Sequence, residues 1–276
     1  MNLNTIQEVR AGPDVSAGGL TWTDGDSWLA GGTWLFSEPQ DHLRRLLDLR
    51  AFDWEPLTVR PEGLRIAATC TIAQLDALVA PLDWVAAPLI ERCCRSLLAS
   101  FKVWNAATVG GNICMSLPAG AMISLTSALE GVCTLRAQDG SERQVPVVDF
   151  VTGNHQNLLL PGELLMAIEL PVSALRKRAA FRRMSLTHQG RSAVLLIGTL
   201  GQDGGLLLMI TAATPRPVQL RFDAVPDAAK LRQRIQDEIP DELYFDDVHG
   251  APDYRRHLTL HFAEEIRAEL AAAPLN

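Results

Sequence analysis

The sequence has 276 residues, of which 47% are hydrophobic and 21% charged, an ordinary composition for a folded protein with a sizeable core. Its formal net charge is −7 and it contains no run of five like charges, which argues against nucleic acid or an anionic membrane surface as the main partner. It has neither a stretch of eighteen apolar residues nor the layout of a signal peptide, so we predict a cytoplasmic protein.

Helices and strands alternate in the first part of the chain. Leu43, Leu46 and Leu47 share one helical face behind Asp41, and Thr71 with Gln74 forms a capping-box pattern. These patterns and similar ones predict helices over 41–49, 71–80, 88–99 and 119–130. Strands are predicted over 57–60, 64–68 and 164–170, together with a hairpin of 132–137 and 144–150 around Asp139-Gly140.

From about residue 178 the sequence changes to long β-like runs. The segments 181–186, 192–200 and 206–214 predict a three-stranded antiparallel sheet, and 228–239 and 254–270 predict two helices on one of its faces. We therefore predict an α+β protein. Its larger part spans 1–175 and is itself divided near 52–60, and a smaller α+β domain spans 177–276.

The cysteines predict free thiols rather than a metal site. There are five, Cys70, Cys93, Cys94, Cys114 and Cys133, which is an odd number without a CxxC motif and fits a reducing compartment. The neighbours Cys93 and Cys94 are interpreted as small core residues. We expect no iron–sulfur cluster and no structural zinc in this chain.

Two glycine pairs interrupt apolar stretches, in LAGGTWLF (29–36) and ATVGGNIC (107–114). Glycine weakens a strand interior, so its presence indicates a close backbone approach or unusual dihedral angles. Two loops with free N–H groups can hold the two phosphates of one dinucleotide, with help from the Thr33 and Thr108 hydroxyls and the Asn112 amide. Either loop alone is equally well a tight turn, but the pair favours a ligand.

Other phosphate and nucleophile motifs are missing from the sequence. It contains no G-x-G-x-x-G after a strand, no G-x-x-x-x-G-K-[ST] and no G-x-S-x-G. A flat, phosphate-bearing cofactor held by a different fold is the remaining prediction.

With these two glycine loops the sequence resembles a known family, the FAD-binding (medium) subunits of the xanthine dehydrogenase and carbon monoxide dehydrogenase molybdenum hydroxylases. LAGGTWLF and NAATVGGNI (105–113) are similar to the two flavin loops of that family. AATCTIAQL (67–75), GELLMAIELP (162–171), AFRRMS (180–185) and DYRRHL (253–258) resemble other stretches, so the likeness runs from about 25 to 265.

The resemblance implies an FAD-binding domain of the vanillyl-alcohol-oxidase (PCMH) type over 1–175, and over 177–276 a domain like the C-terminal one of the carbon monoxide dehydrogenase flavoprotein. It implies that FAD is wrapped by one loop from each side. The residues that it places at the cofactor are Leu29, Ala30, Gly31, Gly32, Thr33, Trp34, Leu35, Phe36, Leu98, Ala99, Thr108, Val109, Gly110, Gly111, Asn112, Leu165 and Arg182.

Three positions depart from the family pattern. Ala121 stands where the family usually has an acidic residue, Trp104 where arginine is common, and Trp34 where an acidic residue follows AGGT. A lost charge-assisted hydrogen bond costs ~1.5–3 kcal/mol, so we expect FAD binding to be weakened but retained.

The function implied by the resemblance is electron transfer within a multi-subunit enzyme. The chain would receive electrons from the 2Fe–2S small subunit, which is fed by the molybdopterin-binding large subunit, and pass them through FAD to NAD⁺ or another acceptor. No catalytic acid or base and no metal ligand is predicted in this chain. The alternatives are a flavin-poor scaffold subunit of the same complex and a stand-alone flavin oxidoreductase.

Several other patterns are given no functional role. His257 and His261 have the i, i+4 spacing of a helical metal pair but lack a third ligand. The repeat of Trp22, Trp28 and Trp34 at every sixth residue matches neither a helix nor a strand, so the spacing is interpreted as coincidental. The acidic stretch 237–247 is interpreted as a solvated edge.

Overall fold

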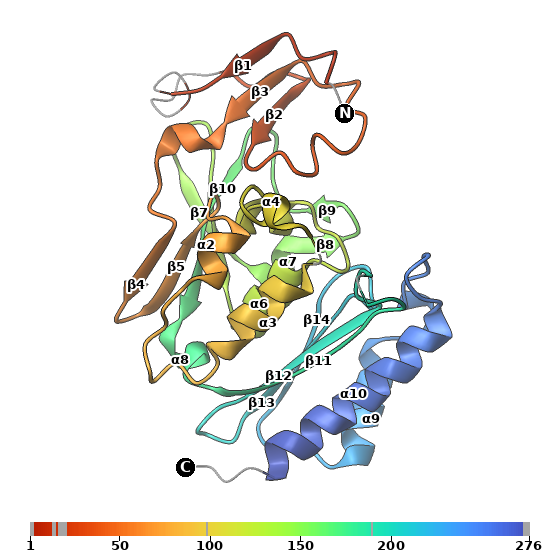
Figure 1. Ribbon diagram of the computed structural model, residues 1–276. Coiled ribbons are helices and arrows are strands. Elements are labelled where there is room, and N and C mark those ends of the chain that lie inside the picture. Colours follow the sequence, from red (N-terminus) through yellow and green to blue (C-terminus); the bar gives the residue numbers. More distant parts are fainter. Residues whose placement is uncertain (1–2, 13–14, 16–20, 98, 189, 273–276) are drawn as a thin grey trace.

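The computed structural model describes residues 3–12, 15, 21–97, 99–188 and 190–272. It is an α+β structure, as predicted, in which three larger sheets are formed by successive stretches of the chain (Figure 1). The N-terminal sheet lies at one end of the molecule and the C-terminal sheet with its two long helices lies at the other.

The N-terminal sheet is parallel, with β3 between β1 and β2. Its strands are β1 (Glu8–Arg10), β2 (Asp26–Leu29) and β3 (Arg45–Asp48), and the 3₁₀ helix η1 (Leu49–Phe52) follows β3. The helix predicted over 41–49 is therefore wrong. Leu46 and Leu47 are buried because β3 is the central strand, and a short apolar run of this kind fits a helix and a buried strand equally well.

The middle sheet is antiparallel and has the strand order β4-β5-β10-β6-β7. Its strands are β4 (Leu57–Arg60), β5 (Gly63–Ala67), β6 (Val132–Arg136), β7 (Glu142–Pro146) and β10 (Leu164–Pro171), and a small hairpin pairs β8 (Val151–Gly153) with β9 (Gln156–Asn157). The strands predicted around Pro61-Glu62-Gly63 and the hairpin at Asp139-Gly140 are confirmed. The second hairpin strand was predicted to run to residue 150, which is wrong, because Val147–Phe150 is helical.

Short helices connect these strands: α2 (Ile72–Asp76), α3 (Pro88–Ser96), α4 (Phe101–Trp104), α5 (Val109–Cys114), α6 (Ala121–Ala128), α7 (Val147–Phe150) and α8 (Val172–Leu175). The capping box of Thr71 and Gln74 is present, although α2 ends earlier than predicted. Pro88 opens α3, where its missing N–H costs no helical bond.

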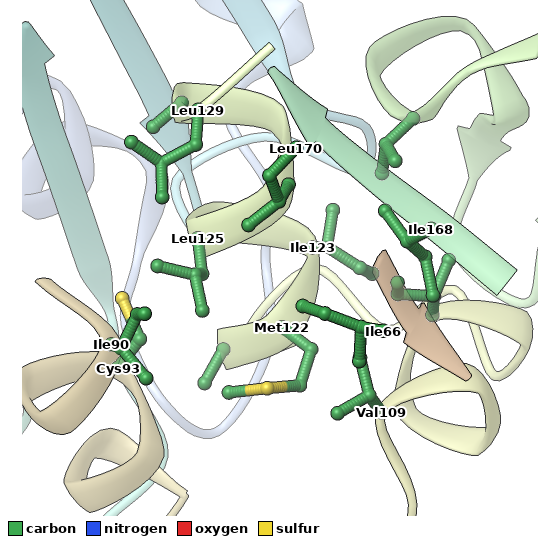
Figure 2. Packing of buried hydrophobic residues seen from close by; sticks show 14 of the residues in the cluster. Ile66, Ile90, Cys93, Val109, Met122, Ile123, Leu125, Leu129, Ile168 and Leu170 are labelled. Atoms are coloured by element: carbon green, nitrogen blue, oxygen red, sulfur yellow. The ribbon is translucent and has the colours of Figure 1, made fainter. Parts of the chain in front are cut away.

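Helix α6 is the centre of the core. All eight of its residues are buried, as expected for a helix that is apolar on every side. Figure 2 shows Met122, Ile123 and Leu125 of α6 surrounded by side chains of the middle sheet, α3 and α5. Cys93 belongs to this core, as predicted, and burial raises the pKa of the neighbouring Cys94 thiol to about 12, so it stays protonated.

The C-terminal sheet has four antiparallel strands in chain order, whereas three were predicted. The elements are β11 (Arg178–Met184), β12 (Val194–Leu200), β13 (Leu206–Thr211), β14 (Val218–Phe222), α9 (Ala228–Glu238), the 3₁₀ turn η2 (Asp241–Leu243) and α10 (Pro252–Ala272). The strand β14 was missed because its five residues follow a proline-rich turn and include two polar side chains. The two predicted helices are confirmed.

Both faces of this sheet are covered. Ile197 and Met209 belong to the core around α6, whereas Leu196 and Ile210 pack against α9 and α10. The Ser124 and Thr211 hydroxyls are hydrogen-bonded at 2.7 Å across the first of these interfaces. Burial from two sides explains the continuous apolar runs of β12 and β13. The division of the chain into domains at 175–177 stays a prediction.

In the ranges that the structure describes, no helix is both long and apolar enough to cross a bilayer.

Candidate cofactor site

The first glycine pair forms a bend directly after β2, which we call the first bend (residues 30–36). Gly32 has a φ of +68°, a conformation that glycine adopts without strain. A β-carbon added at Gly31 would lie 1.7 Å from the carbonyl oxygen of Ala106, so only glycine fits where the first bend packs against the segment before α5.

The backbone N–H groups of the first bend are available to a ligand. None of the four consecutive N–H groups of Gly31–Trp34 donates a hydrogen bond to another described residue. Consecutive free N–H groups form a concavity that binds anions. The first bend therefore has the chemistry that the sequence predicted for it.

The second glycine pair was predicted to lie in a loop, and this is wrong. Thr108 instead caps the helix α5, with its hydroxyl accepting from the Gly111 N–H at 3.0 Å. The Val109 and Gly110 N–H groups donate to Cys70 and Ala68 at 2.8 and 3.0 Å. These amides are thus already paired, so this segment, the second bend (residues 107–112), differs from the first in having few free donors.

The two glycines of the second bend have different roles. A β-carbon at Gly110 would lie 2.7 Å from backbone atoms of Ala68, so Gly110 permits close packing on β5. A β-carbon at Gly111 would meet the Thr108 hydroxyl at 2.9 Å and the Ala30 β-carbon at 3.9 Å. Gly111 therefore faces the first bend, and the two bends meet as predicted.

Both bends line one cavity of about 1210 Å³. This is larger than the ~300–1,000 Å³ of a typical small-molecule site and suits a dinucleotide. The predicted site residues that line it are Leu29, Ala30, Gly31, Gly32, Thr33, Trp34, Leu35, Thr108, Gly110, Gly111, Asn112 and Leu165.

Four predicted residues do not line this cavity, and Leu98 lies outside the described residues. Phe36 is 43% exposed, with its ring against Gly32, and Ala99 is also exposed. Val109 is fully buried in the core because α5 turns its side chain inward. Arg182 points to the opposite face of the C-terminal sheet, where its guanidinium pairs with Glu265 at 2.6 Å and Glu269 at 2.8 Å on α10.

Trp22, Trp28 and Trp34, whose six-residue spacing was interpreted as coincidental, all line the cavity. The rings of Trp22 and Trp28 have centroids 5.6 Å apart, and the Trp28 indole donates to the Glu163 carbonyl at 3.0 Å. A six-residue spacing does not place side chains on one face of a helix or strand. These three residues instead lie before β2, in β2 and in the first bend, and the fold brings them to one cavity. The available signal was the concentration of tryptophan in one short segment.

Three acidic side chains line the cavity, and two of them, Asp26 and Glu163, are paired with arginines, whereas Asp24 has no ion pair among the described residues. Arg143 donates two hydrogen bonds to Glu163, at 2.8 and 2.6 Å, and these hold the pKa of that carboxyl below its usual value. Burial alone would raise the pKa of Asp26, but hydrogen bonds from Arg45 and Thr23 outweigh burial and lower it. The arginines thus offset the negative charge of these two acids in the wall.

Two residues that depart from the family pattern, Ala121 and Trp104, are both part of the local packing beside the cavity. Ala121 is the first residue of α6 and is 1% exposed. The Trp104 indole donates to the Leu97 carbonyl at 3.0 Å. The Asn112 side-chain oxygen accepts from the Met122 N–H at 3.0 Å, which ties α5 to α6 and leaves the amide NH₂ for a ligand.

No cluster of three or more metal-ligating side chains occurs among the described residues. His257 and His261 are exposed on α10, with ring centroids 6.3 Å apart.

Comparisons with known proteins identify the family of this chain. Residues 20–173 match the family described as "FAD binding domain in molybdopterin dehydrogenase". The chain is 26% identical over 141 residues to the carbon monoxide dehydrogenase medium chain of Hydrogenophaga pseudoflava, a match that covers 50% of this chain and 46% of that one. It is 26% identical over 224 residues to subunit alpha of the 6-hydroxypseudooxynicotine dehydrogenase complex of Paenarthrobacter nicotinovorans, covering 74% and 69%.

The fold is also shared with a solved structure. Reconstituted CO dehydrogenase from Oligotropha carboxidovorans contains a chain that superposes with a TM-score of 0.75 at 20% identity, covering 97% of this chain and 99% of that one. The match to the family description extends over more than half of the chain. The chain therefore belongs to the family of FAD-binding domains in molybdopterin dehydrogenases.

Proposed function

We propose that this chain binds FAD in the cavity between the two bends and serves as the flavoprotein subunit of a molybdenum-dependent dehydrogenase. The observation that carries the proposal is the meeting of the two bends on one cavity wall: Gly31 and Ala107, far apart in sequence, approach so closely that a β-carbon added at Gly31 would lie 3.3 Å from the Ala107 Cα. The free N–H groups of Gly31–Trp34 fit a diphosphate, and the indoles of the wall fit flat ring systems.

FAD, when bound, supplies the ability to accept and donate one or two electrons. The contribution of this chain is to hold the cofactor, to shield its rings with apolar side chains and to leave an opening for an acceptor. None of these tasks requires an acid or a base, and two of the three described wall carboxylates, Asp26 and Glu163, are engaged by arginines.

The partners that we propose are a molybdopterin-binding large subunit and a 2Fe–2S small subunit. The two curated relatives described above are themselves named as a medium chain and as a subunit of a complex. Electrons would enter from the iron–sulfur partner and leave to NAD⁺ or another acceptor.

The proposal is tested by purifying the protein in its native complex. We expect the visible absorbance of bound flavin, co-purifying chains that contain molybdenum and iron, and reduction of an artificial dye by NADH. After removal of the flavin, FAD at 100 times its dissociation constant should stabilise the fold by about 2.7 kcal/mol. A protein that takes up no FAD in this titration would instead be a flavin-free scaffold subunit.

A further inference from the structure

Arg191 belongs to the hairpin between β11 and β12 and reaches the first bend from the C-terminal sheet. Its guanidinium carbon lies 6.0 Å from the centroid of the Trp34 ring, a cation–π distance, and both residues line the cavity. The His155 ring lies 5.4 Å from the same indole, so Trp34 is held between two neighbours. Arg191 is thus placed at the end of the first bend by an aromatic contact.

The positive charge of Arg191 is not neutralised within the described part of the chain. No described carboxylate lies within ion-pair distance of Arg191 or of Arg183. Arg45 and Arg143 beside the same cavity are each paired with an acid, whereas Arg44, which also lines it, donates to the carbonyls of Asp41 and Leu43. An arginine at a cavity without a carboxylate partner is suited to an anionic ligand.

Arg183 adds to the charge at this end of the cavity. It is half-buried behind the hairpin, donating to the Ser192 hydroxyl and to the Gly190 carbonyl at 2.7 Å each, and its partners are neutral. Burial lowers the pKa of Arg183, which reflects the cost of holding this charge away from water. An anion in front of Ser192, which lines the cavity, would offset that cost.

Among the described residues, Trp34 lies next to both the free N–H groups of the first bend and the unpaired guanidinium of Arg191. Its N–H group is the last of the four unpaired donors of the first bend, and its ring lies beside Arg191. An anion in the first bend is therefore within the field of a guanidinium that the protein itself leaves unpaired. Arg182, which the family resemblance places at the cofactor, is instead held by two glutamates on the far face of the sheet.

We propose that Arg191 is a cofactor-binding residue that recognises the diphosphate of FAD together with the N–H groups of Gly31–Trp34. This inference rests on the function proposed above, because it assumes that FAD occupies the cavity. It assigns to the C-terminal sheet a direct part in holding the cofactor, with Trp34 positioning the guanidinium.

The test compares FAD with riboflavin, which has the same ring system but no phosphate. In flavin-free protein, Arg191→Gln should weaken FAD binding by about ten-fold and leave riboflavin binding unchanged, because one charge-assisted contact to phosphate is lost. Arg191→Lys should recover part of the loss. Raising the salt concentration should weaken FAD binding less in Arg191→Gln than in the wild type.

Arg182→Gln is the matched control, since it removes a guanidinium from β11, next to the same hairpin, that does not line the cavity. We expect its FAD affinity to equal that of the wild type. Equal FAD affinity in wild type and Arg191→Gln, or an equal loss for FAD and riboflavin, would overturn the inference while leaving the proposed function intact. A wild type that binds no FAD would remove both.

Discussion

A β-carbon added at Gly111 would lie 3.9 Å from the β-carbon of Ala30. Gly111 of α5 therefore faces Ala30 of the first bend, and neither residue has a side chain larger than a methyl group. The site thus depends on two kinds of glycine. Gly31 allows the two segments to approach each other, and Gly111 leaves the space between them free of a side chain.

Gly111→Val tests the second kind. The added methyl groups would project between the bends and into the space proposed for the diphosphate, so we expect FAD affinity to fall by more than ten-fold. Displacing the Thr108 hydroxyl from its cap should cost only about 1 kcal/mol of stability. Flavin titration and thermal unfolding of the same preparation measure the two effects. Unchanged FAD affinity would show that the diphosphate lies elsewhere.

Gly31→Ala tests the first kind. Its β-carbon would overlap the Ala106 carbonyl oxygen at 1.7 Å, which requires a backbone shift, so we expect a loss of at least about 3 kcal/mol in the free energy of unfolding. Gly204→Ala is the control, because Gly204 has a φ of +84° but no atom near the added carbon, and only the backbone cost of about 1–2 kcal/mol applies. Similar losses in urea titrations of the two variants would contradict this explanation.

Glu130 connects the end of α6 to the C-terminal sheet and should make stability depend on pH. It accepts from Lys177 at 2.5 Å and from Arg221 at 2.7 Å. Burial works to raise the pKa of Glu130, but the two cations outweigh it and the pKa is lowered from 4.5. A lowered pKa adds stability above the unfolded-state value, and this stability is lost as the pH falls below about 4.5 towards the folded-state pKa.

Glu130→Gln should therefore be less stable at neutral pH by about 1–3 kcal/mol and lose less of its stability on acidification. Urea titrations at neutral and acidic pH check this. If wild type and variant lost the same amount between the two conditions, the ion pairs of Glu130 would not control the acid response.

Arg255 should be essential for packing α10 on the sheet. It is 1% exposed and donates to the carbonyls of Gly250, Ala193 and Ala212, besides pairing with Asp247. Removing it leaves these oxygens without a donor, so Arg255→Met should cost about 3–5 kcal/mol. Arg255→Lys should not restore stability, because an ammonium cannot reproduce the planar fork of a guanidinium. Chemical unfolding of both variants measures this, and a stable lysine variant would disprove the geometric argument.

The sequence predicted features that depend on local chemistry. The meeting of the two glycine pairs was predicted from the idea that both hold one ligand and not from local spacing. The capping box at Thr71 and the turn at Asp139-Gly140 were recognisable, because each follows from residue types at fixed spacing. The family resemblance was visible for the same reason.

Other features depend on contacts between distant residues and were missed. Leu46 is in a strand rather than a helix because β1 and β2 flank it. The residues next to Leu46 in the sequence do not indicate either of these strand pairings. The choice between Arg182 and Arg191 depends on which face of the C-terminal sheet each side chain takes, and the two carboxylates that hold Arg182 come from α10. The tryptophans of the cavity come together only in the folded chain.

The contribution of the β11–β12 hairpin to the cavity has a consequence for biosynthesis. Arg191 and Ser192 complete a wall that otherwise consists of residues from 22 to 165. A ribosome that has made both glycine pairs has therefore not yet made the whole cavity. Tight loading of a cofactor at this wall must wait until the later hairpin has left the exit tunnel and folded onto α6.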